Sequence, residues 1–160
     1  MRKSLLLIMA ISILLLCTSE IRAQQQAGFG DGFKVTLSKD YQMDKYLSFP
    51  GSSTFSDKKS NISLTSQKLK KSDVDINRQR ENIVKQLKLS KFNVAESKTD
   101  KIGEYPMFLV KSSNNKGKTV YYQYGILVDR TIYMITCATT NSLAGKYEKE
   151  FQKTAESFTR

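Results

Sequence analysis

Alternating apolar and polar residues predict β-strands along most of the chain. Residues 62–67, ISLTSQ, show the period of two that places apolar side chains on one face of a strand. Runs rich in Gly, Pro, Ser and Asn separate such segments, as at 50–53 and 114–117. The predicted strands lie at 33–37, 62–67, 92–99, 105–112, 118–128 and 131–139.

The two longest of these strands are predicted to form a hairpin with two apolar faces. Pairing Val128 with Thr131 places Tyr122 beside Cys137 on one apolar face, and the opposite face is apolar as well. We therefore expect the sheet to be covered on both sides, with Cys137 as a buried, unreactive thiol. Gly125 leaves room on the hairpin for a close neighbour.

Two segments with helical periodicity complete the pattern. The first is predicted to begin at a Ser72 cap, with Asp73 and Asp75 placing negative charge at the positive end of the helix dipole, and to end near Ser90. The second covers 142–158. Their apolar stripes are Ile76, Ile83, Val84 and Leu87 in the first and Leu143, Tyr147, Phe151, Ala155 and Phe158 in the second. The predicted fold class is α+β, an antiparallel β-sheet flanked by helices.

The start of the chain has the three parts of a secretory signal peptide. Arg2 and Lys3 precede an uncharged apolar run at 5–16, and a polar stretch then ends at the small residue Ala23. The apolar run is shorter than the roughly 20 residues that a membrane-spanning helix needs. We therefore predict cleavage between Ala23 and Gln24, and a periplasmic or secreted protein.

A lipoprotein signal is an alternative interpretation of the same segment, with Cys17 as the lipidated residue. Leu16 stands where such signals normally have Gly, Ala or Ser, which favours simple cleavage. The predicted organisation is a signal peptide at 1–23, a flexible Gln- and Gly-rich leader at 24–32, and a single domain at 33–160.

The chain is strongly basic. It has 26 Lys and Arg against 15 Asp and Glu, a net charge of +11. The predicted signal holds three of the basic residues and one acidic residue, so removing it leaves 23 and 14, a net charge of +9. This balance favours acidic partners such as anionic lipid or an acidic protein, and export argues against nucleic acid. The plainer alternative is a solvated basic surface.

Two groups of residues are candidates for surface contacts. The densest basic stretch is a candidate for contact with an anionic surface, and it consists of Lys58, Lys59, Lys68, Lys70 and Lys71. Tyr121 and Tyr133 are candidates for an aromatic contact, with core packing as the alternative.

The chemistry of the chain argues against several kinds of enzyme. It contains no histidine, which removes the Ser-His-Asp and Cys-His constellations and histidine zinc sites. Asp73 and Asp75 are explained as a helix charge cap rather than as metal ligands. We predict a non-enzyme without a cofactor, a catalytic residue or a metal site. A hydrolase that uses Ser-Lys or paired carboxylates is a minor alternative, because no nucleophile–base signature is present.

The second half of the chain resembles the PsbP-like and DcrB-like family, whose fold is shared with Mog-type proteins. The resemblance rests on KIGEYP at 101–106, the tyrosine strand YYQY at 121–124, YMIT at 133–136 and the final ESF at 156–158. It implies an α/β/α sandwich. It also implies a protein-binding role rather than an activity, because members of the family are mostly accessory subunits, envelope proteins, regulators and chaperones.

Together these observations predict an exported, non-catalytic accessory or binding domain of the bacterial envelope that engages another protein. The alternative is a binder of an anionic membrane surface or glycolipid, which the net charge favours.

Overall fold

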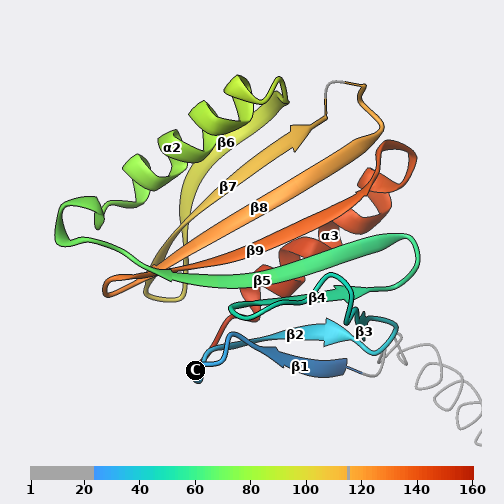
Figure 1. The fold of residues 1–160 in the computed structure, drawn as a ribbon, viewed down its shortest axis with the longest axis horizontal. Helices are drawn as coiled ribbons and strands as arrows, with labels where there is room; N and C mark the ends of the chain where they lie inside the picture. The colour runs from blue at the N-terminus through green and yellow to red at the C-terminus, as the bar shows by residue number, and fades with distance from the viewer. Residues whose placement is uncertain (1–23, 115) are drawn as a thin grey trace, which may run out of the picture.

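The structure of the chain is a computed structural model that describes residues 24–114 and 116–160. Within these residues, nine strands and two α-helices form two sheets with helical cover (Figure 1). The strands are β1 (Gln24–Gly28), β2 (Lys34–Ser38), β3 (Gln42–Met43), β4 (Ser52–Ser56), β5 (Ser60–Lys68), β6 (Asn93–Ile102), β7 (Tyr105–Ser113), β8 (Thr119–Val128) and β9 (Thr131–Thr140). The helices are α2 (Ile76–Leu89) and α3 (Ala144–Glu156), each preceded by a short 3₁₀ turn, at Lys71–Asp73 and Asn141–Leu143.

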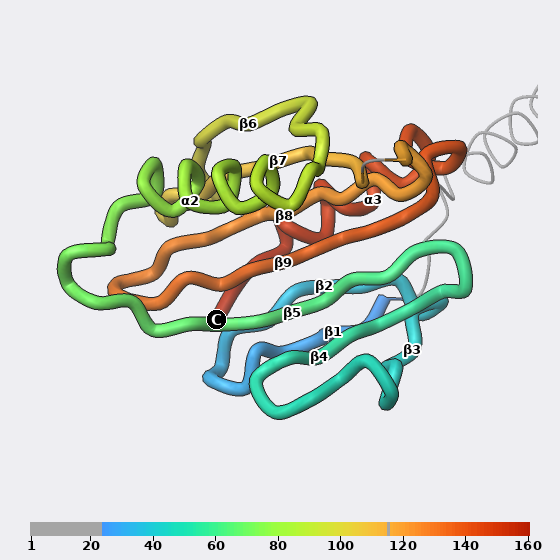
Figure 2. The backbone as a smooth tube through the Cα atoms, turned by 45° about the horizontal axis from the view of Figure 1, so that its top comes forward, coloured from blue at the N-terminus to red at the C-terminus, as the bar shows by residue number. Residues whose placement is uncertain are grey.

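A seven-stranded antiparallel sheet is the centre of the molecule. Its strand order is β3-β4-β5-β9-β8-β7-β6, and β1 and β2 form a separate hairpin. Helix α2 lies on one face of the large sheet, and α3 with the β1–β2 hairpin lies on the other (Figure 2). The predicted α+β class, an antiparallel sheet flanked by helices, is confirmed.

The register of the predicted β8–β9 hairpin is also confirmed. Val128 pairs with Thr131 and Tyr122 pairs with Cys137. One face of the hairpin joins the large core under α3, and the other joins a smaller core under α2. Cys137 is fully buried, as predicted.

Gly125 accommodates a close neighbour, also as predicted. A β-carbon at this position would lie 2.3 Å from the ring of Phe108, which is fully buried on the adjacent strand β7. The absence of a side chain therefore lets the aromatic ring pack directly against the backbone of β8.

The stripe of the second predicted helix faces the large core. Tyr147, Phe151 and Ala155 of α3 are buried, as is Phe158 just beyond the helix end, while Leu143 is partly buried against the same core. A spacing of three to four residues places these side chains on one face of the helix.

The first predicted helix begins later than expected. Ser72 lies in the 3₁₀ turn, and the cap of α2 is Asp75, whose Oδ1 accepts a 2.8 Å hydrogen bond from the Arg78 amide. Val74 separates the two segments, because its backbone (φ −80°, ψ 69°) is not helical. The end of the helix agrees with the prediction, since Ser90 is the C-cap.

The prediction of a flexible leader at 24–32 is wrong at residues 24–28. Residues 24–28 form β1, which pairs in register with β2, and Ala27 is buried. Phe29 then packs edge-on against Tyr133 and Phe158. A Gln-rich run shows no apolar alternation, but its backbone still forms a strand when a neighbouring strand supplies hydrogen-bond partners.

The predicted signal peptide, including Cys17 and the Ala23 side of the cleavage site, lies outside the described residues. Among the residues that the structure describes, no helix is long and apolar enough to cross a membrane.

Candidate binding surface

The Cys137 thiol is buried within the sheet. Burial raises the pKa of the Cys137 thiol well above its ordinary value, which keeps the sulfur protonated and unreactive. Nowhere in residues 24–114 and 116–160 do three or more Cys, Asp or Glu side chains gather as a metal site would require.

The five candidate lysines do not form one patch. Lys58 and Lys59 lie in the turn before β5, while Lys68 ends this strand and Lys70 and Lys71 follow it. Strand β5 advances by about 3.3 Å per residue, so the two groups are separated by roughly 26 Å. All five side chains are exposed. The sequence places them in one stretch, but a straight strand divides them into two groups at opposite ends of the sheet.

The two candidate tyrosines have different positions. Tyr133 is buried, its hydroxyl donates a 2.6 Å hydrogen bond to Asp31, and burial raises its pKa to about 12. Its ring belongs to the large core and is not available to a partner. Tyr121 is half-buried, and its ring lies 5.6 Å from that of Phe92.

A groove between α2 and β6 is the candidate binding surface that sequence reasoning missed. Its volume is about 490 Å³, and we call it the α2 groove. It is lined by Arg80, Glu81, Val84, Lys85, Lys88, Leu89 and Ser97. Val84 and Leu89 supply apolar surface, and three cations against one carboxylate give the groove a positive charge. The signal in the sequence is Leu89, an apolar residue outside the apolar stripe of α2, with 75% of its surface exposed.

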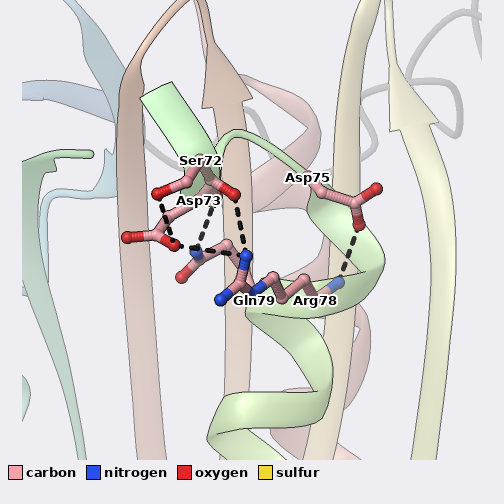
Figure 3. Close-up of polar contacts among 5 residues, drawn as sticks. All are labelled: Ser72, Asp73, Asp75, Arg78 and Gln79. Atoms are coloured by element: carbon pink, nitrogen blue, oxygen red, sulfur yellow. Dashed lines mark hydrogen bonds and ion pairs between the residues drawn. The ribbon is translucent and has the colours of Figure 1, made fainter. Parts of the chain in front are cut away.

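The start of α2 is anchored by a polar network (Figure 3). Arg78 donates a 2.8 Å hydrogen bond to the Ser72 carbonyl and lies 3.4 Å from the Asp73 carboxylate. Gln79 donates to the Asp73 carbonyl at 2.8 Å. Together with the Asp75 cap, these contacts attach the helix to the preceding turn and set its position over the sheet. Arg78 is thus engaged within the chain, unlike Lys85 and Lys88, which are exposed along the groove.

The sheet edge beside the groove is protected against pairing with another strand. Strand β6 pairs with β7 on one side, and among the described residues no strand pairs with its other side. A register shift between Val94 and Glu96 and an ion pair of 2.7 Å between Glu96 and Lys98 interrupt this edge. Bulges and charged side chains discourage edge-to-edge association. The unpaired side of β6 is therefore poorly suited to the addition of another strand.

Comparison with solved structures shows which known proteins share this fold. No protein-family model and no curated protein matches the chain. The cyanobacterial PsbP protein (CyanoP) of Synechocystis sp. PCC 6803 superimposes with a TM-score of 0.68 at 11% identity, over 89% of this chain and 95% of that one. LpqN, a protein involved in cell envelope biogenesis of Mycobacterium tuberculosis, gives 0.62 at 11% identity, over 85% and 89%.

A protein of unknown function from Pseudomonas aeruginosa gives a TM-score of 0.51 at 10% identity, over 86% of this chain and 96% of that one. The chain therefore has a PsbP-like fold, as the motifs in its second half predicted. At these identities the likeness concerns the fold.

Proposed function

We propose that the chain is an exported, non-catalytic accessory domain that binds another protein of the cell envelope. The α2 groove carries the proposal, because it combines exposed apolar surface with a positive rim. The predicted signal peptide supports export, and the fold is similar to that of LpqN, which takes part in cell envelope biogenesis. A fold hosts many functions, so the groove and not the likeness is the basis for the binding role.

The groove suits an acidic segment that carries one large apolar side chain. Such a side chain would cover Leu89 and Val84, and a buried apolar anchor is the usual centre of a protein interface. Lys85 and Lys88 would attract acidic residues around that anchor, which favours fast association and the correct register.

The absence of catalysis is part of the proposal. It is supported by the lack of histidine in the sequence and by the burial of Cys137. Turnover of acyl, glycosyl or phosphoryl substrates by the purified protein would contradict it, and would favour the histidine-free hydrolase instead.

Site-specific crosslinking in the host cell tests the binding role. A photo-crosslinking amino acid replaces Leu89 in the full chain, and in a matched control it replaces Asn82, which is exposed on the same helix outside the groove. We expect position 89 to crosslink one envelope protein that position 82 does not, and Lys85→Glu with Lys88→Glu to abolish that product. Identical products from both positions would contradict the proposal.

A further inference from the structure

The end of β3 and the loop that joins it to β4 expose four large apolar side chains. The fully exposed one is Tyr46, at 100%, and the other large apolar side chains are exposed by half or more: Met43 by 55%, Leu47 by 52% and Phe49 by 67%. We call these four side chains the edge strip. Exposed apolar groups that gather on one segment mark an interaction surface, whereas single exposed residues do not.

The edge strip rests on an ordered backbone. The Asp44 amide donates to the Thr54 carbonyl at 2.8 Å, and the Thr54 hydroxyl donates to the Leu47 carbonyl at 3.2 Å. Phe49 and Ser52 exchange two amide–carbonyl bonds of 3.0 and 2.8 Å. The loop therefore follows the outer edge of β4, held there by backbone hydrogen bonds. Its exposed apolar side chains are what it offers to a partner.

Lysines lie at both ends of the edge strip. Strand β4 pairs with β5, with Ser52 opposite Thr65 and Ser56 opposite Asn61. The turn with Lys58 and Lys59 therefore follows one end of the strip, while Lys68, Lys70 and Lys71 lie beyond the other end. The exposed Lys45 lies within the loop itself. Figure 2 shows the loop, β4 and β5 running side by side along this edge of the molecule.

This arrangement favours a membrane surface over a protein. Two basic groups roughly 26 Å apart match a broad, diffuse negative charge better than a few acidic side chains. Tyrosine and other amphipathic aromatic residues favour the headgroup layer of a bilayer, and lysines near the surface add attraction to anionic lipids. The strip also projects from a sheet edge, so its side chains can enter a lipid layer without a change of fold.

We propose that the edge strip docks on the surface of an anionic phospholipid bilayer. Tyr46, Leu47 and Phe49 enter the headgroup layer, and the two lysine groups contact the lipid headgroups on either side. This contact is separate from the α2 groove, because β4 and β6 lie near opposite edges of the sheet.

Vesicle sedimentation tests the proposal on the processed, exported protein. The probes are vesicles of phosphatidylcholine alone and of phosphatidylcholine with about one third phosphatidylglycerol, at low and high salt. We expect binding to the anionic vesicles, weakened by salt.

Tyr46→Ser with Phe49→Ser should reduce this binding at least tenfold. Replacing any one of Lys58, Lys59 and Lys68 with Gln should reduce binding to the anionic vesicles roughly fivefold at low salt. Asn82→Ser, on α2 at the far edge and outside the α2 groove, is the control and should bind as the unmodified protein does.

Insertion can be observed directly because the chain contains no tryptophan. Phe49→Trp introduces a single reporter, whose fluorescence should shift to the blue on anionic vesicles and be quenched by brominated lipid. Asn82→Trp, on α2 outside the groove, should show neither change. An unshifted reporter at position 49 would overturn the proposal.

Three other outcomes would also overturn it: equal binding to neutral and anionic vesicles, full binding by the Tyr46→Ser, Phe49→Ser variant, or a concentration-dependent dimer that this variant abolishes without any vesicle binding. The vesicle assay contains no protein partner, so its failure is distinguishable from failure of the crosslinking at the α2 groove.

Discussion

The carboxylate of Asp57 joins the β4–β5 turn to helix α3. It accepts hydrogen bonds from the amides of Lys59 and Ser60 at 2.9 and 2.7 Å and from the Ser60 hydroxyl at 2.9 Å. Its second oxygen accepts from the Tyr147 hydroxyl at 2.7 Å. Partial burial alone would raise the pKa of Asp57, but the hydrogen bonds from Tyr147, Lys59 and Ser60 outweigh it and hold the pKa below its ordinary value of 3.8.

This residue gives a pH-dependent prediction. A carboxyl whose pKa is lowered by folding stabilises the protein above its unfolded pKa, and this contribution is lost as the pH falls through the folded pKa. Asp57→Asn should therefore lower the free energy of unfolding by about 1–3 kcal/mol at pH 7. Urea unfolding at pH 7 and below pH 3.8 would measure the difference, which should shrink at the lower pH.

Tyr147→Phe is the matched control for that variant. It removes one of the donors to Asp57 and keeps the charge of the carboxylate. It should therefore lower the free energy of unfolding by about 1 kcal/mol. A difference between Asp57→Asn and the unmodified protein that stays constant over the same pH range would show that the charge of this carboxyl plays no part.

At the scale of elements, the two helices differ in how firmly they are held. Helix α3 buries Ala144, Tyr147, Phe151, Thr154 and Ala155, whereas α2 has no fully buried residue. The position of α2 therefore depends more on its first turn, where Asp75 caps the helix and Arg78 bonds to the preceding segment (Figure 3).

The cap can be tested against the residue that the sequence suggested. Asp75→Ala should lower the free energy of unfolding by about 1 kcal/mol, because the Arg78 amide loses its acceptor. Ser72→Ala should change it by less than about 0.5 kcal/mol, since the Ser72 hydroxyl donates an exposed 3.3 Å hydrogen bond to the Asp73 carboxylate while the cap of α2 is Asp75. Denaturant unfolding of both variants compares them directly. Equal losses would mean that Ser72 contributes to the helix start after all.

The elements also show how far the sequence alone could lead. The β8–β9 hairpin was predictable residue by residue, because its apolar residues fall in register around the short reversal at 129–130. Strand β1 was not, because glutamines carry no alternation and its strand is formed through β2. The loop carrying the edge strip resisted prediction for a similar reason, since its backbone bonds to β4 without regular spacing.

The candidate surfaces were predictable only in part. The positions of the five candidate lysines can be read from the sequence. That they form two groups at opposite ends of β5 follows only from the structure, in which this strand is extended and pairs with β4 and β9. The α2 groove depends on where the helix rests over β6. Leu89 marked it only as an apolar residue outside the stripe, a weak signal without the neighbouring strand.

At the scale of the whole molecule, the sheet separates two proposed contacts. The edge strip lies along β4 near one edge, and the α2 groove lies beside β6 at the other. A domain that rests on a membrane by the first would present the second away from the lipid. The central strands β5, β9 and β8 connect the two edges as one continuous hydrogen-bonded ladder.

The unequal cores on the two faces of the sheet predict unequal stability. Among the described residues, the core under α2 has five buried members, Leu69, Phe108, Val110, Leu127 and Ile132. The core under α3 has many more, drawn from the β1–β2 hairpin, the large sheet and α3. Regions with few buried apolar contacts open at lower free energy than the global transition. We therefore expect amides of α2 to exchange with solvent by local opening, while those of β8 and β9 exchange only by global unfolding.

Hydrogen exchange followed by mass spectrometry at increasing low concentrations of urea separates the two regimes. The α2 peptides should show a smaller free energy of opening and a weaker dependence on urea than the β8 and β9 peptides. Asp75→Ala should lower the opening free energy of α2 by about the 1 kcal/mol that its cap contributes. If α2 opened only together with β8 and β9, the two faces of the sheet would form one cooperative unit, and the groove would be as rigid as the core beneath α3.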